Sequence, residues 1–425
     1  MKKILVVLCA AVVLLAGCSK KESAAGSAGA PKQNKLAVWT AVEDFETMIN
    51  TYYKPSHPDV EIEYTYVTTM DEKLGTVLAS GQGVPDVFSL EASYVRKYVE
   101  SGLVLDITDM YSGVRDKVYQ YVADVGSHNG KVYGLAWQTT PGVIYYRRSL
   151  AKQYLGSDDP DTVQSFFANP QKFLETAALL KSKSGGTCYV MGNGTELGRP
   201  YRNNRVQPWV VDGRLVIDPL MLDYMDMVKE IRDKGYDAKI NHWTDSWYAS
   251  LNGALQDENG KPIDIFGVFL PAWGLFYVLM PGGSDTSGDW GIIPGPYTYF
   301  EGGTWLSAWN KTQNPEAAKE FIRYFATDDE LLETWVSTTY DMISNSRVVE
   351  KLRSSSLEVP FLGGQNPYTI YADIAGQISG KLFQGTDGAI YTIFDENVTA
   401  FVNGEKTKDQ AIADFKDQVN TQMGY

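Results

Sequence analysis

Apolar and polar positions alternate with two different periods over the first quarter of the chain. From Val60 to Tyr66 every second residue is apolar, as in a half-buried strand, whereas apolar residues recur from Phe45 at i, i+3, i+4 and i+7, the helical period. The pattern predicts strands over 35–40, 60–66 and 85–90 and helices over 45–52 and 71–80. Strands that alternate with helices predict an α/β fold with a largely parallel sheet covered on both faces.

The first 18 residues follow a different pattern. Lys2 and Lys3 precede the apolar run 4–15, which has the length of a secretory signal, roughly 7 to 15 residues, and is shorter than the roughly 20 needed to span a membrane. The run ends in Leu-Ala-Gly-Cys at 15–18, which resembles a bacterial lipoprotein signal. The resemblance implies that Cys18 carries lipid and holds the protein at the extracytoplasmic face of the cell membrane. An ordinary cleaved signal or a short membrane helix is the alternative.

Composition changes again over 19–35, which is rich in Ser, Ala, Gly and Lys and is predicted to be a flexible linker. Removal of the signal leaves 38 − 2 = 36 basic residues against 52 acidic ones. An acidic surface of this kind disfavours nucleic acid as a partner. Cys9 leaves with the signal and Cys18 takes the lipid, so Cys188 remains alone and no intramolecular disulfide is expected.

Several short segments, each a weak signal alone, occur in one order along the chain. They are Ser-Gly-Gln-Gly-Val-Pro-Asp-Val-Phe at 80–88, Gly-Leu-Val-Leu-Asp-Ile at 102–107, Gly-Lys-Val-Tyr-Gly-Leu at 130–135, Gly-Gly-Thr-Trp at 302–305 and Asn-Pro-Glu-Ala-Ala-Lys-Glu-Phe-Ile at 314–322. The series resembles the family 1 extracellular solute-binding proteins, the substrate-capturing subunits of ABC importers. In the last segment Asn314 suits an N-cap, Pro315 suits the first helical position, and a buried stripe follows.

The resemblance implies a type II periplasmic-binding-protein-like fold. Two α/β lobes, each a mainly parallel sheet flanked by helices, are then joined by a multi-segment hinge, with the ligand in the cleft between them. Motif order places the crossings near 137–142, 299–303 and 342–344. The N-terminal lobe is expected to combine 36–138 with 303–341, and the C-terminal lobe 142–299 with 345–425.

The abundance of aromatic residues favours a sugar as ligand. The chain has 27 Tyr, 16 Phe and 10 Trp, and a pyranose ring stacks its CH face on aromatic rings while its hydroxyl groups need polar partners. The candidate ligand contacts are Trp39, Glu43, Asp44, Glu91, Gln138, Glu196, Trp273, Trp305 and Tyr391.

Two arguments support individual members of this set. Glu43 and Asp44 begin the helix after the first strand, which resembles the family position where carboxylates reach ligand hydroxyls; helix capping is the alternative. Glu91 follows the strand at 85–90, at a carboxyl end where α/β sheets present ligand groups, with an exposed loop acid as the alternative. Trp273 lies in 266–274, which resembles the family segment in which a Trp closes over bound sugar; the alternative is a core Trp.

A pair of tryptophans and a cluster of arginines each have two possible roles. Trp243 and Trp247 are four residues apart and are predicted to share a helix face, which is usual for packing but would also suit an oligosaccharide beside a cleft. Arg199, Arg202 and Arg205 are predicted to form a solvated loop, with recognition of an acidic sugar as the alternative because Arg binds carboxylates with two parallel hydrogen bonds.

The sequence gives no support for catalysis, a metal or a cofactor. It contains neither a Gly-x-x-x-x-Gly-Lys-Ser/Thr phosphate loop nor a Gly-x-Ser-x-Gly nucleophile turn, and its three histidines are far apart. The expected protein is a monomer that hands a carbohydrate to ABC permease subunits. Two alternatives remain: a non-sugar solute such as ferric iron, and a surface polysaccharide-degrading lipoprotein that uses Glu43, Glu91 or Glu196 as paired carboxylates.

Overall fold

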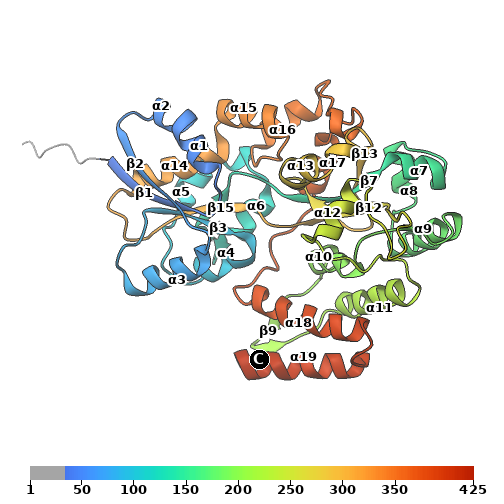
Figure 1. The fold of residues 1–425 in the computed structure, drawn as a ribbon. Coiled ribbons are helices and arrows are strands. Elements are labelled where there is room, and N and C mark those ends of the chain that lie inside the picture. The colour runs from blue at the N-terminus through green and yellow to red at the C-terminus, as the bar shows by residue number, and fades with distance from the viewer. Residues whose placement is uncertain (1–33) are drawn as a thin grey trace, which may run out of the picture. The chain divides into compact units, whose positions relative to one another are not determined.

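The computed structural model describes residues 34–425, so the predicted signal, the lipidation site Cys18 and nearly all of the predicted linker lie outside the described residues. Two main sheets organise this part of the chain, each with its own helices (Figure 1). The first has the strand order β2-β1-β3-β15-β6. Its strands are β1 (Asn34–Thr40), β2 (Val60–Tyr66), β3 (Val87–Glu91), β6 (Gly134–Ala136) and β15 (Thr304–Ala308).

The strands and helices expected in the first third are confirmed within a few residues. The helix predicted over 45–52 begins as α1 (Phe45–Met48) and continues as a π-helical turn, and the next helix is α3 (Met70–Ser80). The sheet is mixed, however, because β1 pairs in parallel with β2 and β3, whereas β15 runs antiparallel to both β3 and β6. β15 arrives from far along the chain, so no local βαβ unit sets its direction.

Helices cover this first sheet. They are α1, α2 (Lys54–Ser56), α3, α4 (Ala92–Val99), α5 (Thr108–Ser112), α6 (Gln120–Val125), α14 (Pro315–Thr327) and α15 (Asp329–Thr339). Helix α16 (Ser346–Arg353) packs on α15 and on α17 (Tyr368–Ala375), and α17 contacts β7 of the second sheet. The stripe predicted on α14 is confirmed: Phe321 and Phe325 are fully buried and pack on Phe45, with ring centroids 6.3 and 4.5 Å away. Asn314 occupies the N-cap position, but its side-chain amide donates to the carbonyl of Lys35 instead of capping the helix.

The second sheet is antiparallel throughout, contrary to the expected mainly parallel sheet. Its order is β12-β7-β13, and β14 also pairs with β7. The strands are β7 (Pro141–Arg147), β12 (Gly267–Pro271), β13 (Trp290–Ile293) and β14 (Tyr299–Phe300). Almost every residue of these strands is buried, and a run buried on both faces reads as continuously apolar whether its neighbours are parallel or antiparallel.

The helices of the second sheet are α7 (Arg148–Leu155), α8 (Pro160–Ser165), α9 (Pro170–Lys183), α10 (Gly198–Asn203), α11 (Pro219–Asp233), α12 (Asp245–Leu251), α13 (Met280–Gly282), α18 (Asp387–Val402) and α19 (Lys408–Met423). Short strand pairs add to both groups: β4 (Ser127–His128) with β5 (Lys131–Val132), β8 (Cys188–Tyr189) with β11 (Asp264–Ile265), and β9 (Val210–Val211) with β10 (Arg214–Leu215). Helices α18 and α19 pack on one another around Phe394 and Phe415, whose ring centroids are 5.0 Å apart (Figure 1).

The three segments expected to cross between the lobes are hydrogen-bonded to one another. The backbone N–H of Thr139 donates to the carbonyl of Met342 over 2.8 Å, and the N–H of Glu301 donates to the carbonyl of Thr140 over 3.2 Å. The close approach depends on Gly142, because a Cβ atom there would lie 2.0 Å from the ring of Tyr299. The structure therefore holds 137–142, 299–303 and 342–344 in one backbone layer.

Candidate functional site

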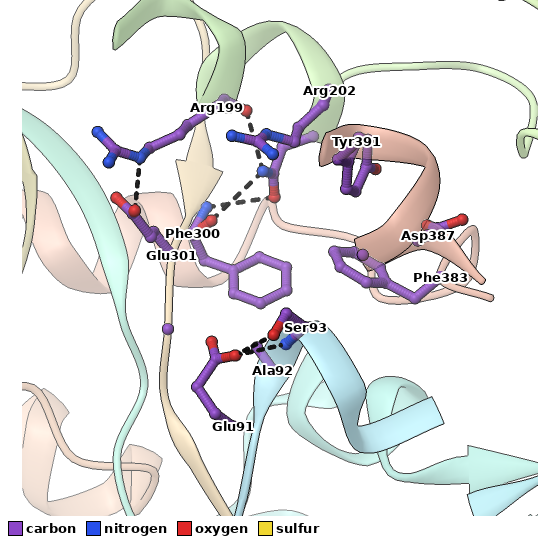
Figure 2. Close-up of a pocket in the computed structure, with 13 residues that line it drawn as sticks. Glu91, Ala92, Ser93, Arg199, Arg202, Phe300, Glu301, Phe383, Asp387 and Tyr391 are labelled. Carbon is purple, nitrogen blue, oxygen red and sulfur yellow. Dashed lines mark hydrogen bonds and ion pairs between the residues drawn. The ribbon is translucent and has the colours of Figure 1, made fainter. Parts of the chain in front are cut away.

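A cavity of about 180 Å³ lies where elements of the two sheets meet (Figure 2). Its walls come from the end of β3 and the start of α4, from α10, from the segment after β14, and from the start of α18. The lining residues are Glu91, Ala92, Ser93, Arg199, Arg202, Asn203, Phe300, Glu301, Gly302, Phe383, Asp387, Gly388 and Tyr391. Aromatic rings and charged groups thus share one small space.

Guanidinium groups and carboxylates alternate along the upper wall of the cavity. Arg199 Nε lies 2.5 Å from Glu301 Oε1, and Nη1 of Arg199 is buried without a hydrogen-bond partner. Arg202 covers the ring of Tyr391, with 4.7 Å from Cζ to the ring centroid, and its Nη1 is 3.9 Å from Asp395. These contacts leave guanidinium N–H groups available to a hydroxyl group inside the cavity.

Glu91 lies on the opposite side of the cavity from the two arginines (Figure 2). As the last residue of β3 it also caps α4, accepting hydrogen bonds at Oε2 from the backbone N–H of Ser93, 2.9 Å away, and from the Ser93 hydroxyl. Burial raises the pKa of Glu91, and the hydrogen bonds from Ser93 oppose this shift. Glu91 is therefore not the exposed loop acid of the alternative prediction: it caps α4, and the cap fixes its carboxyl group at the cavity wall.

A buried ion pair supports the wall from behind. Arg205 Nη2 is 3.3 Å from Asp387 Oδ2 and donates to the hydroxyl of Tyr391 over 2.6 Å. Burial raises the pKa of Asp387 to about 6, although Arg205 opposes the shift. The predicted solvated loop is wrong, because Arg199 and Arg202 lie in α10 and Arg205 is only 5% exposed. Arg202 and Arg205 instead contact Tyr391, whereas Arg199 pairs with Glu301.

Beyond the crossing segment at Glu301 lies a second aromatic group. The indole N–H of Trp273 donates to the carbonyl of Glu301 over 3.1 Å. Tyr277 lies one turn further along, and its hydroxyl donates to Oδ2 of Asp44 over 3.0 Å. Trp243 stacks on Trp273 with centroids 6.5 Å apart and ring planes 12° apart.

The structure distributes the predicted site residues over several places. Glu91 and Tyr391 line the cavity, while Asp44 and Trp273 belong to the aromatic group beside it. Glu43 is exposed next to Asp44, and Trp39 lines a shallow pocket against α3 together with Thr69, Glu72, Lys73, Thr76 and Val77.

The remaining predicted residues are buried among protein partners. Gln138 donates to Oδ2 of Asp341 over 2.9 Å within the crossing layer. Glu196 belongs to a capping box with Asn193 and lies 3.0 Å from Nε2 of His242. Trp305 is fully buried, and its indole N–H donates to the carbonyl of Val122 over 2.8 Å.

Sequence reasoning did not select several cavity residues: Phe300, Glu301, Phe383 and Asp387. Phe300 and Glu301 carried a signal, since both lie inside a predicted crossing and Glu301 directly precedes the Gly-Gly pair of a family-like segment. Within residues 34–425 no cluster of three or more His, Cys, Asp or Glu side chains is arranged to hold a metal ion. In the same part of the chain no helix combines the length and the apolar character needed to cross a membrane.

The chain is similar to known proteins over most of its length. A family model for bacterial extracellular solute-binding proteins matches residues 40–354. The arabinooligosaccharide-binding protein of Bacillus subtilis (strain 168) is 24% identical over 404 residues, which cover 88% of each protein.

Solved structures share the two-lobe α/β fold. An extracellular solute-binding protein of family 1 matches with a TM-score of 0.80 at 20% identity, over 91% of this chain and 99% of that one. The galacto-N-biose/lacto-N-biose I-binding protein of an ABC transporter from Bifidobacterium longum matches with a TM-score of 0.71 at 18% identity, over 92% and 97%. Since the family model spans well over half of the sequence, the chain belongs to the bacterial extracellular solute-binding protein family.

Proposed function

We propose that this protein captures a sugar or oligosaccharide between its two lobes and delivers it to the permease subunits of an ABC importer. The observation that carries the proposal is the cavity, in which aromatic rings face paired arginines and carboxylates. No covalent step is involved. The curated relative from Bacillus subtilis, which binds arabinooligosaccharides, and the Bifidobacterium structure with lacto-N-biose support a carbohydrate as the class of ligand.

The cavity suits the two kinds of surface that a sugar presents. The rings of Phe300, Phe383 and Tyr391 offer apolar faces to the CH groups of a sugar ring. The carboxylates of Glu91 and Glu301 accept hydrogen bonds from hydroxyl groups, while Arg199 donates them. Because Arg199 and Arg202 each face a carboxylate, the cavity carries no large excess of positive charge, which favours a neutral sugar over a uronate.

The crossing layer is proposed to be the hinge, with lobes of 36–138 plus 303–341 and of 142–299 plus 345–425. On this division the hydrogen bond between Asp44 and Tyr277 joins the two lobes. The cavity of about 180 Å³ is smaller than the roughly 300–1,000 Å³ of typical ligand sites. A sugar enters when the lobes separate, and it drives closure by binding the closed state more tightly.

The proposal includes a lipid anchor on Cys18, with 19–35 as the tether and the folded part acting as a monomer at the extracytoplasmic face. It follows from the lipoprotein-like signal alone. In cells, the Cys18→Ser variant should leave the membrane fraction, whereas the wild-type protein should sediment with membranes. If the variant and the wild-type protein sedimented equally with membranes, the lipid anchor would be contradicted, but the proposed binding function would be unaffected.

Thermal shift measurements on residues 19–425 test the binding function. The panel contains mono-, di- and trisaccharides of arabinose, galactose and glucose, with galacturonate and ferric citrate for the alternatives. A ligand that binds only the native state at 100 times its Kd stabilises by about 2.7 kcal/mol. We expect a saturable rise in Tm with one neutral series and its loss in Arg199→Ala, while Lys172→Ala on the exposed face of α9 serves as control.

Two outcomes would contradict a sugar-binding function, and one would contradict the preference for a neutral sugar. A response to ferric citrate alone would identify an iron-binding protein, and a response to galacturonate alone would identify an acidic ligand. Shorter products released from a glycan would identify an enzyme.

A further inference from the structure

Trp243 combines exposure with an unusual backbone conformation. Its side chain is 51% exposed, and its φ angle is +68°, in the left-handed region. That region costs a residue with a bulky side chain roughly 1–2 kcal/mol and is ordinarily occupied by Gly or Asn. Strain of this kind persists only where surrounding contacts impose it, and it is concentrated at binding sites.

Contacts with neighbouring aromatic rings hold Trp243 in this position. Its ring packs against the fully buried Trp247, 5.2 Å away between centroids, and lies edge-on to His242 at 6.0 Å. Trp247 itself is fixed in α12, whose N-cap is Thr244. The predicted shared helix face is therefore wrong: Trp247 is core, whereas Trp243 precedes the helix and turns half of its surface to solvent.

Trp243 is connected to the cavity through Trp273. The two rings are nearly parallel, 12° apart, and the indole N–H of Trp273 is bound to the carbonyl of Glu301, whose side chain lines the cavity. Gly302 keeps this junction open, because a Cβ atom there would lie 3.2 Å from Nε1 of Trp273. Polar groups also lie near Trp273. Tyr277 follows Trp273 by one helical turn, and its hydroxyl donates a hydrogen bond to Asp44.

We propose that Trp243 is a stacking platform for an outer sugar unit of an oligosaccharide whose inner unit occupies the cavity. The inference rests on the proposed function and adds that the natural ligand has at least two sugar units. An exposed, flat indole held in a strained conformation suits the CH face of a sugar ring, which gains contact area without needing a charged partner. It also explains how a cavity too small for an oligosaccharide contributes to binding one.

Isothermal titration with mono-, di- and trisaccharides of arabinose, galactose and glucose tests the inference on Trp243→Ala, Trp243→Phe and the wild-type protein. For a trisaccharide that the wild type binds, Trp243→Ala should raise the Kd about fivefold to tenfold. The Kd of the corresponding monosaccharide should stay within about twofold, because only the outer unit contacts the indole. Trp243→Phe should recover most of the trisaccharide affinity, and Val211→Ala in the β9 hairpin is the surface control.

Unfolding temperatures without ligand separate a binding role from a packing role. The Tm of Trp243→Ala should lie within about 2 °C of the wild type, because the side chain is half exposed and alanine, which also has a Cβ atom, leaves the backbone strain unchanged. A lower Tm with unchanged Kd for every sugar length, or an equal loss of affinity for mono- and trisaccharides, would overturn the inference and leave sugar binding intact. If the wild type bound none of these sugars, the proposed function would fail and this inference with it.

Discussion

The side-chain amide of Gln138 donates a 2.9 Å hydrogen bond to Oδ2 of Asp341, although the two residues are 203 positions apart in sequence. Asp341 is fully buried, and its Oδ1 accepts a hydrogen bond from the backbone N–H of Met342 over 2.8 Å. Burial raises the pKa of Asp341 to about 7, although the hydrogen bonds from Met342 and Gln138 oppose the shift. A carboxyl group with a pKa near neutral therefore lies directly beside segment 342–344 of the proposed hinge.

We expect the contribution of Asp341 to stability to fall as pH rises from about 4 to about 7. In this window the folded protein holds a proton on Asp341 that the unfolded chain, with a pKa of about 3.9, has released. Above the folded pKa both states are ionised and the contribution levels off. Asp341→Asn should therefore be more stable than the wild type at pH 8 and lose most of this slope, since the amide of Gln138 turns to accept a hydrogen bond.

Urea denaturation at pH 5 and pH 8 measures the effect. Asp285→Asn, at an exposed carboxylate, is the matched control and should leave the slope unchanged. Destabilisation of Asp341→Asn by the same amount at both pH values would show that the carboxyl group has only a packing role.

The buried pair of Arg205 and Asp387 predicts a pH-dependent loss of stability. Arg205→Met leaves the Asp387 carboxylate buried without its cation, and breaking such a pair costs about 3–5 kcal/mol. The pKa of Asp387, about 6 with Arg205 in place, should rise further in the variant. The loss should therefore be full at pH 8 and much smaller at pH 5, where the carboxyl group takes up a proton.

The double variant Arg205→Met, Asp387→Asn is the control for this experiment. It removes both charges and should recover much of the stability at pH 8. If the single variant lost the same free energy of unfolding at pH 5 and pH 8, the destabilisation would come from lost packing against Trp209 and Tyr391 and not from an unpaired charge.

Local signals in the sequence were sufficient for the elements but not for their assembly. The alternation of apolar and polar residues in β2 and the apolar stripe of α14 are both visible within a short stretch of sequence, so both elements were predicted. The antiparallel direction of the second sheet depends on which distant segments pair with β7. An apolar run indicates that a strand is buried but not which strands it pairs with or in which direction.

The same limit applies to the site. Glu91 was predicted because its place at a strand end is a local property, whereas the pairing of Arg199 with Glu301 joins residues far apart in the chain. Trp273 and Trp305 both lie in family-like segments, but only the folded chain places one beside the cavity and the other in the core.

This contrast between Trp273 and Trp305 gives a third prediction. Trp305→Phe removes a buried indole and its hydrogen bond to Val122, so it should lower the free energy of unfolding by about 1–3 kcal/mol while leaving sugar Kd unchanged. Trp273→Phe, at a half-buried ring, should weaken sugar binding severalfold with little change in Tm. Titration calorimetry and thermal unfolding of both variants check the pair, and the reverse assignment of effects would place Trp305 at the ligand.

The hydrogen bond from Tyr277 to Asp44 predicts how closure depends on a single contact. On the proposed lobe division this bond forms only when the lobes are close, so Tyr277→Phe should destabilise the closed state by about 0.5–1.5 kcal/mol. Apparent sugar affinity should then fall about twofold to tenfold, since the competent state is less populated. Small-angle X-ray scattering of the ligand-free variant should show a larger radius of gyration than the wild type. Asp44→Asn keeps an acceptor for the Tyr277 hydroxyl and should behave like the wild type, whereas unchanged scattering and affinity in Tyr277→Phe would show that this bond does not bridge moving parts.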